Sequence, residues 1–320
     1  LYALLLFVLR PLWRRWRRLK LLLLLLLVLF LVSFAFFTGL SSSVVRSVVM
    51  FSLLAFAGLQ PEKPLTLNTL AATAFLMLLC KPVWLFDVGF QLSFSAVAAI
   101  VLVQPKLYAF WKVDNRFLRY LWGLMTVSMA AQLGTAPLVI FYFSRFSTHF
   151  LLTNLWVIPM VSLVLYSAVF LLMLTPLPFV QHLFARVVEA LVHVQNEVLR
   201  WIEHLPGAAV DDIWLDIWGV LLVYLFLGMA YYGFLRLTVR RVCFALLALL
   251  AVVSWHSLSI MSNAPRQGIA FYSVRGCPVV HCMADNRHSW LACTDSLPDM
   301  PRLCRALSPH WNRLHLETPR

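Results

Sequence analysis

The sequence predicts an all-α membrane protein, a polytopic bundle of transmembrane helices. Two observations on composition support this class: 62% of the residues are hydrophobic and only 12% are charged, whereas soluble domains carry about 25% charged residues. The third observation is that the apolar residues form runs near the roughly 20 residues that a helix needs to cross the hydrocarbon core. A soluble chain this apolar would expose large greasy patches and aggregate, so that class is excluded.

Eight apolar runs, besides a partial run over residues 1–9, indicate about seven to eight crossings. They cover Leu21–Phe37, Val44–Leu59, Leu67–Phe86, Val88–Val103, Tyr120–Phe143, Leu151–Leu174, Ile213–Leu235 and Val242–Met261. Residues 1–262 therefore form a predicted transmembrane domain. Because the chain begins at Leu1, inside an apolar run and without the features of a signal peptide, we expect a fragment.

The segment over residues 181–205 differs from the spans, because polar residues recur there at helical spacing between apolar ones. This pattern predicts an amphipathic helix that lies along the membrane interface. The alternative is an ordinary helix packed on other protein. His182, His193 and His204 fall on one stripe of this helix, and we interpret them as part of its polar face rather than as metal ligands.

The net charge of +13 is explained first by basic residues on the cytoplasmic side of the membrane. Basic clusters occur over residues 10–20, 106–119 and 236–241. If every run crosses once, the third cluster falls on the opposite side from the first two, so one segment must be re-entrant or broken. We expect it between Tyr120 and Leu174, where Pro137 and Pro159 interrupt the runs. Broken helices at membrane depth face protein or a water-filled cavity.

Residues 263–320 change in character and predict a short extracytoplasmic tail with β-structure. Gly268–Val274 and Pro278–Met283 are β-prone runs separated by a turn. The tail holds Cys277, Cys282, Cys293 and Cys304. Two disulfides are one option on an oxidising side of a membrane, a zinc site with nearby histidines ranks below it, and a mixture of free and paired thiols ranks first. Cys80 and Cys243 lie in apolar runs and are expected to be inert core residues.

Polar residues inside the spans are the candidates for function, because a charge in hydrocarbon is costly and usually faces a cavity or partner. Arg46 follows a run of small residues that begins at Thr38-Gly39, and small residues let helix backbones approach closely. Arg46 either contacts a ligand, holds a pore helix, or extends its side chain to the interface from a helix end. Asp87 precedes Val88-Gly89 and is expected to cap the next helix.

Amide and hydroxyl side chains supply the remaining candidates. They are Gln91, Ser93, Gln132, Thr135 and Asn154, and they occur with Pro137 and Pro159. Such side chains either form contacts between helices or line a pore. No metal-binding or catalytic motif accompanies them, so we predict no metal, no cofactor and no enzymatic activity.

In this order the motifs resemble the ComEC-type competence family, the membrane component of natural DNA uptake. The matching pieces are Thr38-Gly39 with Ser43 and Arg46, Asp87-Val88-Gly89-Phe90-Gln91-Leu92-Ser93-Phe94, Gln132-Leu133-Gly134-Thr135-Ala136-Pro137, Phe146-Ser147, Asn154 and Pro159. The resemblance covers about residues 21–175, and more loosely extends to residue 261.

The resemblance implies a multi-pass channel in the bacterial cytoplasmic (inner) membrane that passes single-stranded DNA during natural transformation. Arg46, Gln91, Ser93, Gln132, Thr135 and Asn154 would then lie on the DNA path, and Gly39, Asp87, Gly89, Pro137 and Pro159 would shape it. The implied partners are the lipid bilayer, a periplasmic DNA receptor, a nuclease acting in trans and a cytoplasmic DNA motor. The nuclease domain of the family is not carried over, because the tail lacks its metal motif.

A strand of DNA that crosses such a channel needs a wet path, because a bare phosphate charge in hydrocarbon costs many kcal/mol. Aromatic rings can add stacking steps for the bases. The candidates are Phe90, Phe94, Phe143 and Phe146. For any single one of them, ordinary packing against lipid or other helices is the preferred interpretation. Two other functions stay open: a transporter of a small-molecule or lipid-linked substrate, and an intramembrane enzyme acting on glycans.

Overall fold

A computed structural model describes residues 20–57, 66–111, 113–173, 178–210, 213–235, 238–262, 268–274, 277–283 and 289–293, together with residues 175, 307 and 311. It divides into two compact units. The first holds residues 1–112 and 130–135, and the second holds residues 113–129 and 136–320. The partial apolar run over residues 1–9 and nearly all of the first basic cluster lie outside the described residues.

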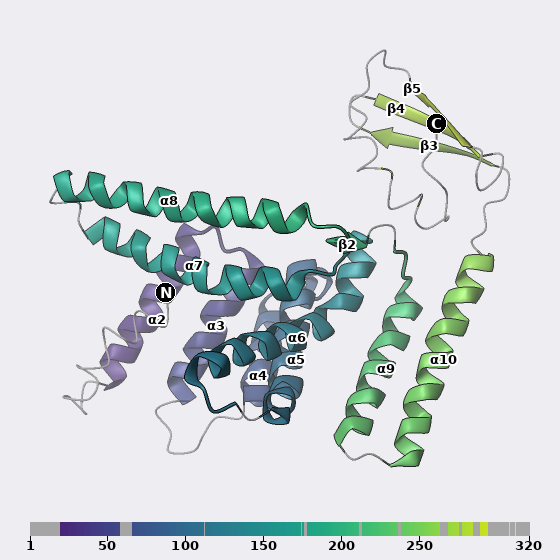
Figure 1. Ribbon diagram of the computed structural model, residues 1–320, viewed down its shortest axis with the longest axis horizontal. Helices are drawn as coiled ribbons and strands as arrows, with labels where there is room; N and C mark the ends of the chain where they lie inside the picture. The colour runs from purple at the N-terminus through teal and green to yellow at the C-terminus, as the bar shows by residue number, and fades with distance from the viewer. Residues whose placement is uncertain are drawn as a thin grey trace. The chain divides into compact units, whose positions relative to one another are not determined.

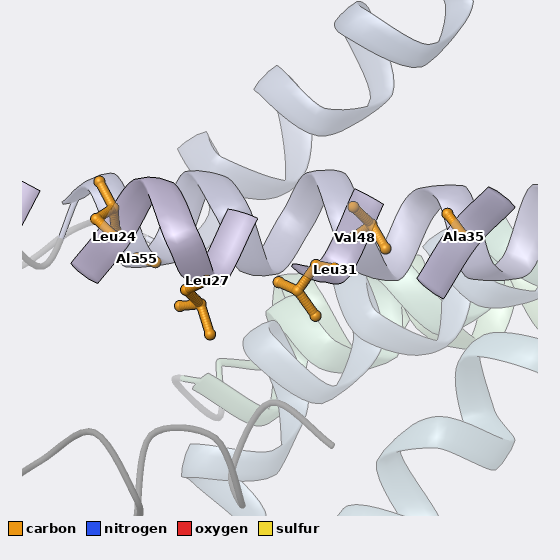
Figure 2. Close-up of a cluster of buried hydrophobic side chains, with 6 residues drawn as sticks. All are labelled: Leu24, Leu27, Leu31, Ala35, Val48 and Ala55. Atoms are coloured by element: carbon orange, nitrogen blue, oxygen red, sulfur yellow. The ribbon is translucent and has the colours of Figure 1, made fainter. Parts of the chain in front are cut away.

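The first unit begins with helices α2 (Lys20–Phe37) and α3 (Ser42–Ala57). Leu24, Leu27, Leu31 and Ala35 of α2 are buried at spacings of three and four residues, and Val48 and Ala55 of α3 pack in the same cluster (Figure 2). Residues three and four apart lie on one face of a helix. The two helices therefore pair along a continuous apolar seam. The other face of α2 remains exposed, as a lipid-facing surface does, whereas α3 also packs against α4 and α5.

Helix α4 (Thr66–Cys80), the 3₁₀ helix η2 (Pro82–Phe86) and helix α5 (Val88–Phe110) complete the first unit, with one turn of α6. The predicted single span over residues 67–86 is thus divided, and that prediction is wrong. Lys81 adopts an extended conformation in front of Pro82. A proline disfavours helical backbone in the residue before it, so α4 ends there.

The second unit contains most of α6 (Arg116–Phe143), then α7 (Phe150–Met173), α8 (Pro178–Glu203), α9 (Ile217–Leu235) and α10 (Val239–Ser262) (Figure 1). Helix α7 packs against α8, and α9 packs against α10. Both α6 and α7 continue through their prolines, Pro137 and Pro159. The prediction that these prolines break the spans is therefore wrong. A proline can persist inside a membrane helix where neighbouring groups satisfy the freed carbonyl.

Among the residues that the structure describes, four helices are long and apolar enough to cross a membrane: α5, α6, α7 and α10. Helices α2, α3, α4 and α9 are also apolar but shorter over their most apolar stretches. The predicted class, a helical membrane protein, is confirmed. Cys80 on α4 and Cys243 on α10 are exposed, which corrects their expected burial. Hydropathy alone does not separate a lipid-facing position from the protein core.

The predicted amphipathic helix is present as α8. Its half-buried residues contact α7, with the rings of Phe170 and Phe184 centred 5.0 Å apart. His182, His193 and His204 are all exposed, as expected for a polar face. Its position along the membrane interface remains a prediction.

A short antiparallel ladder joins the two ends of the α7–α8 pair. Strand β1 (Phe146–Ser147) precedes α7, and strand β2 (Ala209–Val210) follows α8; Phe146 is opposite Val210 and Ser147 is opposite Ala209. The Thr148 hydroxyl donates to the Gly207 carbonyl, and the Thr148 amide donates to Ala208. The chain therefore leaves into α7 and returns from α8 at the same place.

This return bears on the sidedness conflict between the basic clusters. Because the α7–α8 pair starts and finishes at one ladder, it would leave the chain on the side of the membrane where it began. If α6 and α9 each cross once, Arg116 and Arg119 at the start of α6 then fall on the same side as Arg240 and Arg241 at the start of α10. The exceptional segment would be the α7–α8 pair, of which α7 lies within the expected range between Tyr120 and Leu174. The sides of the membrane themselves stay a prediction.

The tail contains a three-stranded antiparallel sheet, β3 (Gly268–Val274), β4 (Cys277–Met283) and β5 (Ser289–Cys293), in that order. The predicted β-structure is confirmed, and β5 adds a strand that the sequence analysis did not specify. Cys282 is a free thiol. The side chains of Cys277, Cys293 and Cys304 lie outside the described residues, so their pairing stays a prediction.

Candidate functional site

The start of helix α5 is built by Asp87. Its backbone is extended, and its carboxylate Oδ1 accepts a hydrogen bond of 3.0 Å from the amide of Phe90. An aspartate in this position satisfies one of the amides that a helix leaves without a partner in its first turn. The predicted cap is therefore confirmed. One turn along, the side-chain amide of Gln91 donates to the Leu85 carbonyl at 2.9 Å and holds η2 against α5.

Arg46 of α3 binds this same helix start. Its Nη1 donates to the Gly89 carbonyl at 3.2 Å, and its Nη2 donates to the Ser43 hydroxyl at 3.0 Å. Arg46 is only 9% exposed, and the carboxylate of Asp87 attracts its charge. Because the guanidinium is bound by protein groups, the structure favours the expectation that Arg46 holds a helix. The guanidinium joins α3 to the first turn of α5.

Gly39 ends helix α2 in a left-handed conformation, with a φ of +77°. The Gly39 amide donates to Phe36 at 3.1 Å, and the Leu40 amide donates to Ala35 at 2.9 Å. These two bonds form a Schellman motif, which favours glycine at this position. A Cβ on Gly39 would meet nothing within 4 Å. Gly39 is therefore needed for its conformation, and the expected close approach of backbones there is wrong.

The close approach occurs instead at Gly134 of α6. A Cβ on Gly134 would lie 2.5 Å from the Ala99 Cβ and 2.5 Å from the Ser95 carbonyl oxygen, both on α5. Real Cβ atoms essentially never approach so closely. Small residues allow this kind of contact between membrane helices. Residues 130–135 of α6 thus pack on α5 within the first unit.

The polar candidates around this contact are half-buried. Ser93 lies on α5, and Gln132 and Thr135 flank Gly134 on α6; the Thr135 hydroxyl donates to the Ala131 carbonyl at 3.0 Å. The structure brings Arg46 into contact with Gly89, on the helix turn that Asp87 caps, and places Gln132 and Thr135 on the part of α6 that meets α5. Asn154 is half-buried on α7 of the second unit.

The aromatic residues considered for base stacking differ in their burial. Phe90 is only 5% exposed, and its ring centroid lies 4.3 Å from that of Phe94. Phe90 is therefore a packing residue, as preferred for any single aromatic residue, and it is not placed to stack on a base. Phe143 is 61% exposed at the end of α6. The Phe146 ring packs against Phe150 at 6.4 Å.

Two buried or polar contacts were missed by the sequence analysis. Thr73 of α4 is fully buried, and its hydroxyl donates to Thr69 at 2.7 Å. Asp216 accepts from the Gly219 amide at 3.0 Å and from the Trp255 indole at 2.9 Å, which joins the start of α9 to α10. An aspartate just before an apolar run is a sequence signal for a cap, but nothing in the sequence indicates its tryptophan partner.

Within the described part of the chain, no group of three His, Cys, Asp or Glu residues is placed to hold a metal ion. The site is instead an arginine buried beside the capped start of a membrane helix, with amides and hydroxyls further along. An ionisable residue inside a membrane domain is a mark of function more often than of stability.

These features define a helical membrane protein with a buried charge among its spans. The sequence profile of the Competence protein family matches residues 1–237, and the chain belongs to that family. This membership gives the protein a role in competence. The chain is also similar to ComE operon protein 3 of Bacillus subtilis (strain 168), with 29% identity over 122 residues, which is 38% of this chain and 15% of that protein. The chain therefore matches only a small part of that relative's length. No solved structure matches it.

Proposed function

We propose that the chain forms the membrane channel that passes one strand of DNA across the bacterial cytoplasmic membrane during natural transformation. Membership of the Competence protein family supports DNA uptake as the process. The observation that carries the channel is the buried guanidinium of Arg46 on the first turn of α5, held by Gly89 and Ser43.

In this proposal, the charges near the two ends of helix α5 assign the site to one side of the membrane. Its 23 residues span about 34 Å at 1.5 Å per residue, slightly more than a hydrocarbon core of roughly 30 Å. Its C-terminal end carries Lys106, and Arg116 and Arg119 follow in the next segment. Basic residues favour the cytoplasmic side. The opposite end, with Arg46 and Asp87, therefore belongs to the outer mouth of the path, where DNA arrives.

In this proposal Arg46 is a positioning residue for the mouth, because its donors are turned to Gly89 and Ser43. Gln91 and Ser93 follow on α5, and Gln132 and Thr135 lie on the packed turn of α6. These residues line the path, and Asn154 on α7 of the second unit is assigned to it from the family resemblance alone. Amides and hydroxyls replace water around phosphates without the tight retention that many cations would cause. A DNA receptor, a nuclease in trans and a cytoplasmic motor would act around this passive path.

The test is uptake of end-labelled duplex DNA into a nuclease-protected cytoplasmic form, in cells that lack the gene. Wild type restores uptake, and Arg46→Ala, present in the membrane at wild-type amount, restores little of it. DNA binding at the cell surface stays unchanged in both. Arg46→Lys gives an intermediate value, because a lysine keeps the charge but does not reach two acceptors with a planar fork.

Arg200→Ala is the matched control. Arg200 lies on α8 with its side chain 69% exposed, in a surface ion pair with Glu197. Such pairs contribute about 0–1 kcal/mol, so this variant should take up DNA like wild type. Unchanged uptake in the deletion strain refutes the proposed function. Full uptake with Arg46→Ala leaves the family role intact but removes Arg46 from the path.

A further inference from the structure

The tail sheet has two distinct faces, which follow from its register. Residue Ile269 is opposite Cys282, which is opposite Trp290; Phe271 is opposite Val280, which is opposite Ala292. Side chains alternate between the faces of a sheet with a period of two. These six residues therefore share one face, here called the open face. The rows through Ala270 and Tyr272 form the opposite face.

The opposite face is covered by the chain itself. Val279 and His281 are 1% and 0% exposed, and Leu307 and Trp311 are 3% exposed. The ring centroids of His281 and Trp311 lie 6.1 Å apart, and Tyr272 stacks on His281 at 6.0 Å. A segment that includes Trp311 therefore closes this face.

The open face is apolar and uncovered. Ile269, Phe271 and Trp290 are 63%, 79% and 54% exposed. An antiparallel sheet with one face in water usually alternates, with polar residues outward. A contiguous patch of isoleucine, phenylalanine and tryptophan is instead a binding surface.

A short segment of the chain connects the strand β3 of this face to the end of the membrane helix α10. Only residues 263–267 link Ser262, the last residue of α10, to Gly268. Five residues reach at most about 17 Å. Apolar residues are exposed up to the end of α10, where Leu258 and Met261 are 60% and 76% exposed. The exposed apolar end of α10 and the open face are therefore close to one another along the chain.

We propose that the open face rests on the membrane, with Phe271 and Trp290 at the boundary between headgroups and acyl chains of the leaflet where α10 ends. Aromatic side chains, tryptophan above all, favour this boundary. The proposal rests on the chain being a membrane protein and not on the DNA path.

The test compares positions on the two faces of the sheet, including the adjacent positions 271 and 272. A photoreactive benzoylphenylalanine is placed at position 271, 290 or 272 of the full chain in native membranes. After irradiation, the purified protein is examined by mass spectrometry for its adducts. Lipid adducts are expected from positions 271 and 290. Position 272 should react within the chain, with the segment around Trp311, because Tyr272 faces that segment.

Three results overturn the proposal. A cross-linked dimer from positions 271 and 290 shows that a second copy of the chain covers the open face. An adduct with another segment of the same chain shows that the protein covers it. Unreacted 271 and 290 beside a reacted 272 show that the face meets only water. Since 272 is the neighbour of 271, its expected reaction also shows that the sheet has folded in the labelled protein.

Discussion

Gly134→Ala should loosen the contact between α5 and α6. The added Cβ would lie 2.5 Å from both the Ala99 Cβ and the Ser95 carbonyl oxygen. An ordinary carbon contact is roughly 3.5–4.0 Å, so the two helices must separate by about 1 Å. Ser95 contributes a backbone atom, which cannot rotate away. Overpacking of this kind costs about 1–3 kcal/mol, and the better helix propensity of alanine returns roughly 0.5–1 kcal/mol, so the net loss is about 0.5–2 kcal/mol.

The assay is thermal unfolding of the purified protein in detergent, with Gly228→Ala as the control. Gly228 lies on α9, and a Cβ there meets nothing within 4 Å, so its alanine variant should unfold at or above the wild-type midpoint. Adding Ala99→Gly to Gly134→Ala should recover only part of the loss, because the clash with the Ser95 carbonyl remains. A midpoint for Gly134→Ala equal to that of Gly228→Ala would refute the close contact.

Three further substitutions test the local structure by the same unfolding assay. Asp87→Ala removes the helix cap and should lower the free energy of unfolding by about 0.5–2 kcal/mol. Asp87→Asn keeps the cap, so any loss in this variant measures the attraction between the Asp87 carboxylate and Arg46. Equal losses for the two variants would contradict the cap. Gly39→Ala should cost about 1 kcal/mol because its φ is +77°, and no loss would contradict the left-handed turn. Ser144→Gly should be more stable than Ser144→Ala by about 1 kcal/mol, since Ser144 ends α6 at a φ of +52°; the reverse order would contradict that conformation.

Hydropathy was sufficient to predict the membrane helices. An apolar run inside a membrane must form its backbone hydrogen bonds within the protein, and a helix does so. The amphipathic helix was likewise predictable from its helical period, and the β-structure of the tail from β-prone runs separated by a turn. Asp87 was predicted as a cap because its signal is local. Each of these predictions depended only on residues that are close together in the sequence.

Features that depend on distant residues were not predictable in this way. Gly39 and Gly134 are both glycines in or beside apolar helices, yet one is needed for its φ and the other for the space that a Cβ would fill. The prolines looked like breaks because the sequence does not show which carbonyls have other partners. The return of the chain after α8 depends on the pairing of Phe146 with Val210, residues far apart in the chain.

Three of the motif segments that carry the family resemblance meet at one helix. Arg46 from the first segment holds the first turn of α5 at Gly89, and Asp87 from the second segment caps that turn. Gly134 from the third segment packs against α5 at Ser95, six residues further along. Six residues correspond to about 9 Å of helix, so α5 is fixed at two points on either side of Gln91 and Ser93. Contacts that served only to hold the bundle together would not need to gather on one helix. A helix whose polar side chains must face a path needs both its start and its rotation to be fixed, and these contacts supply both.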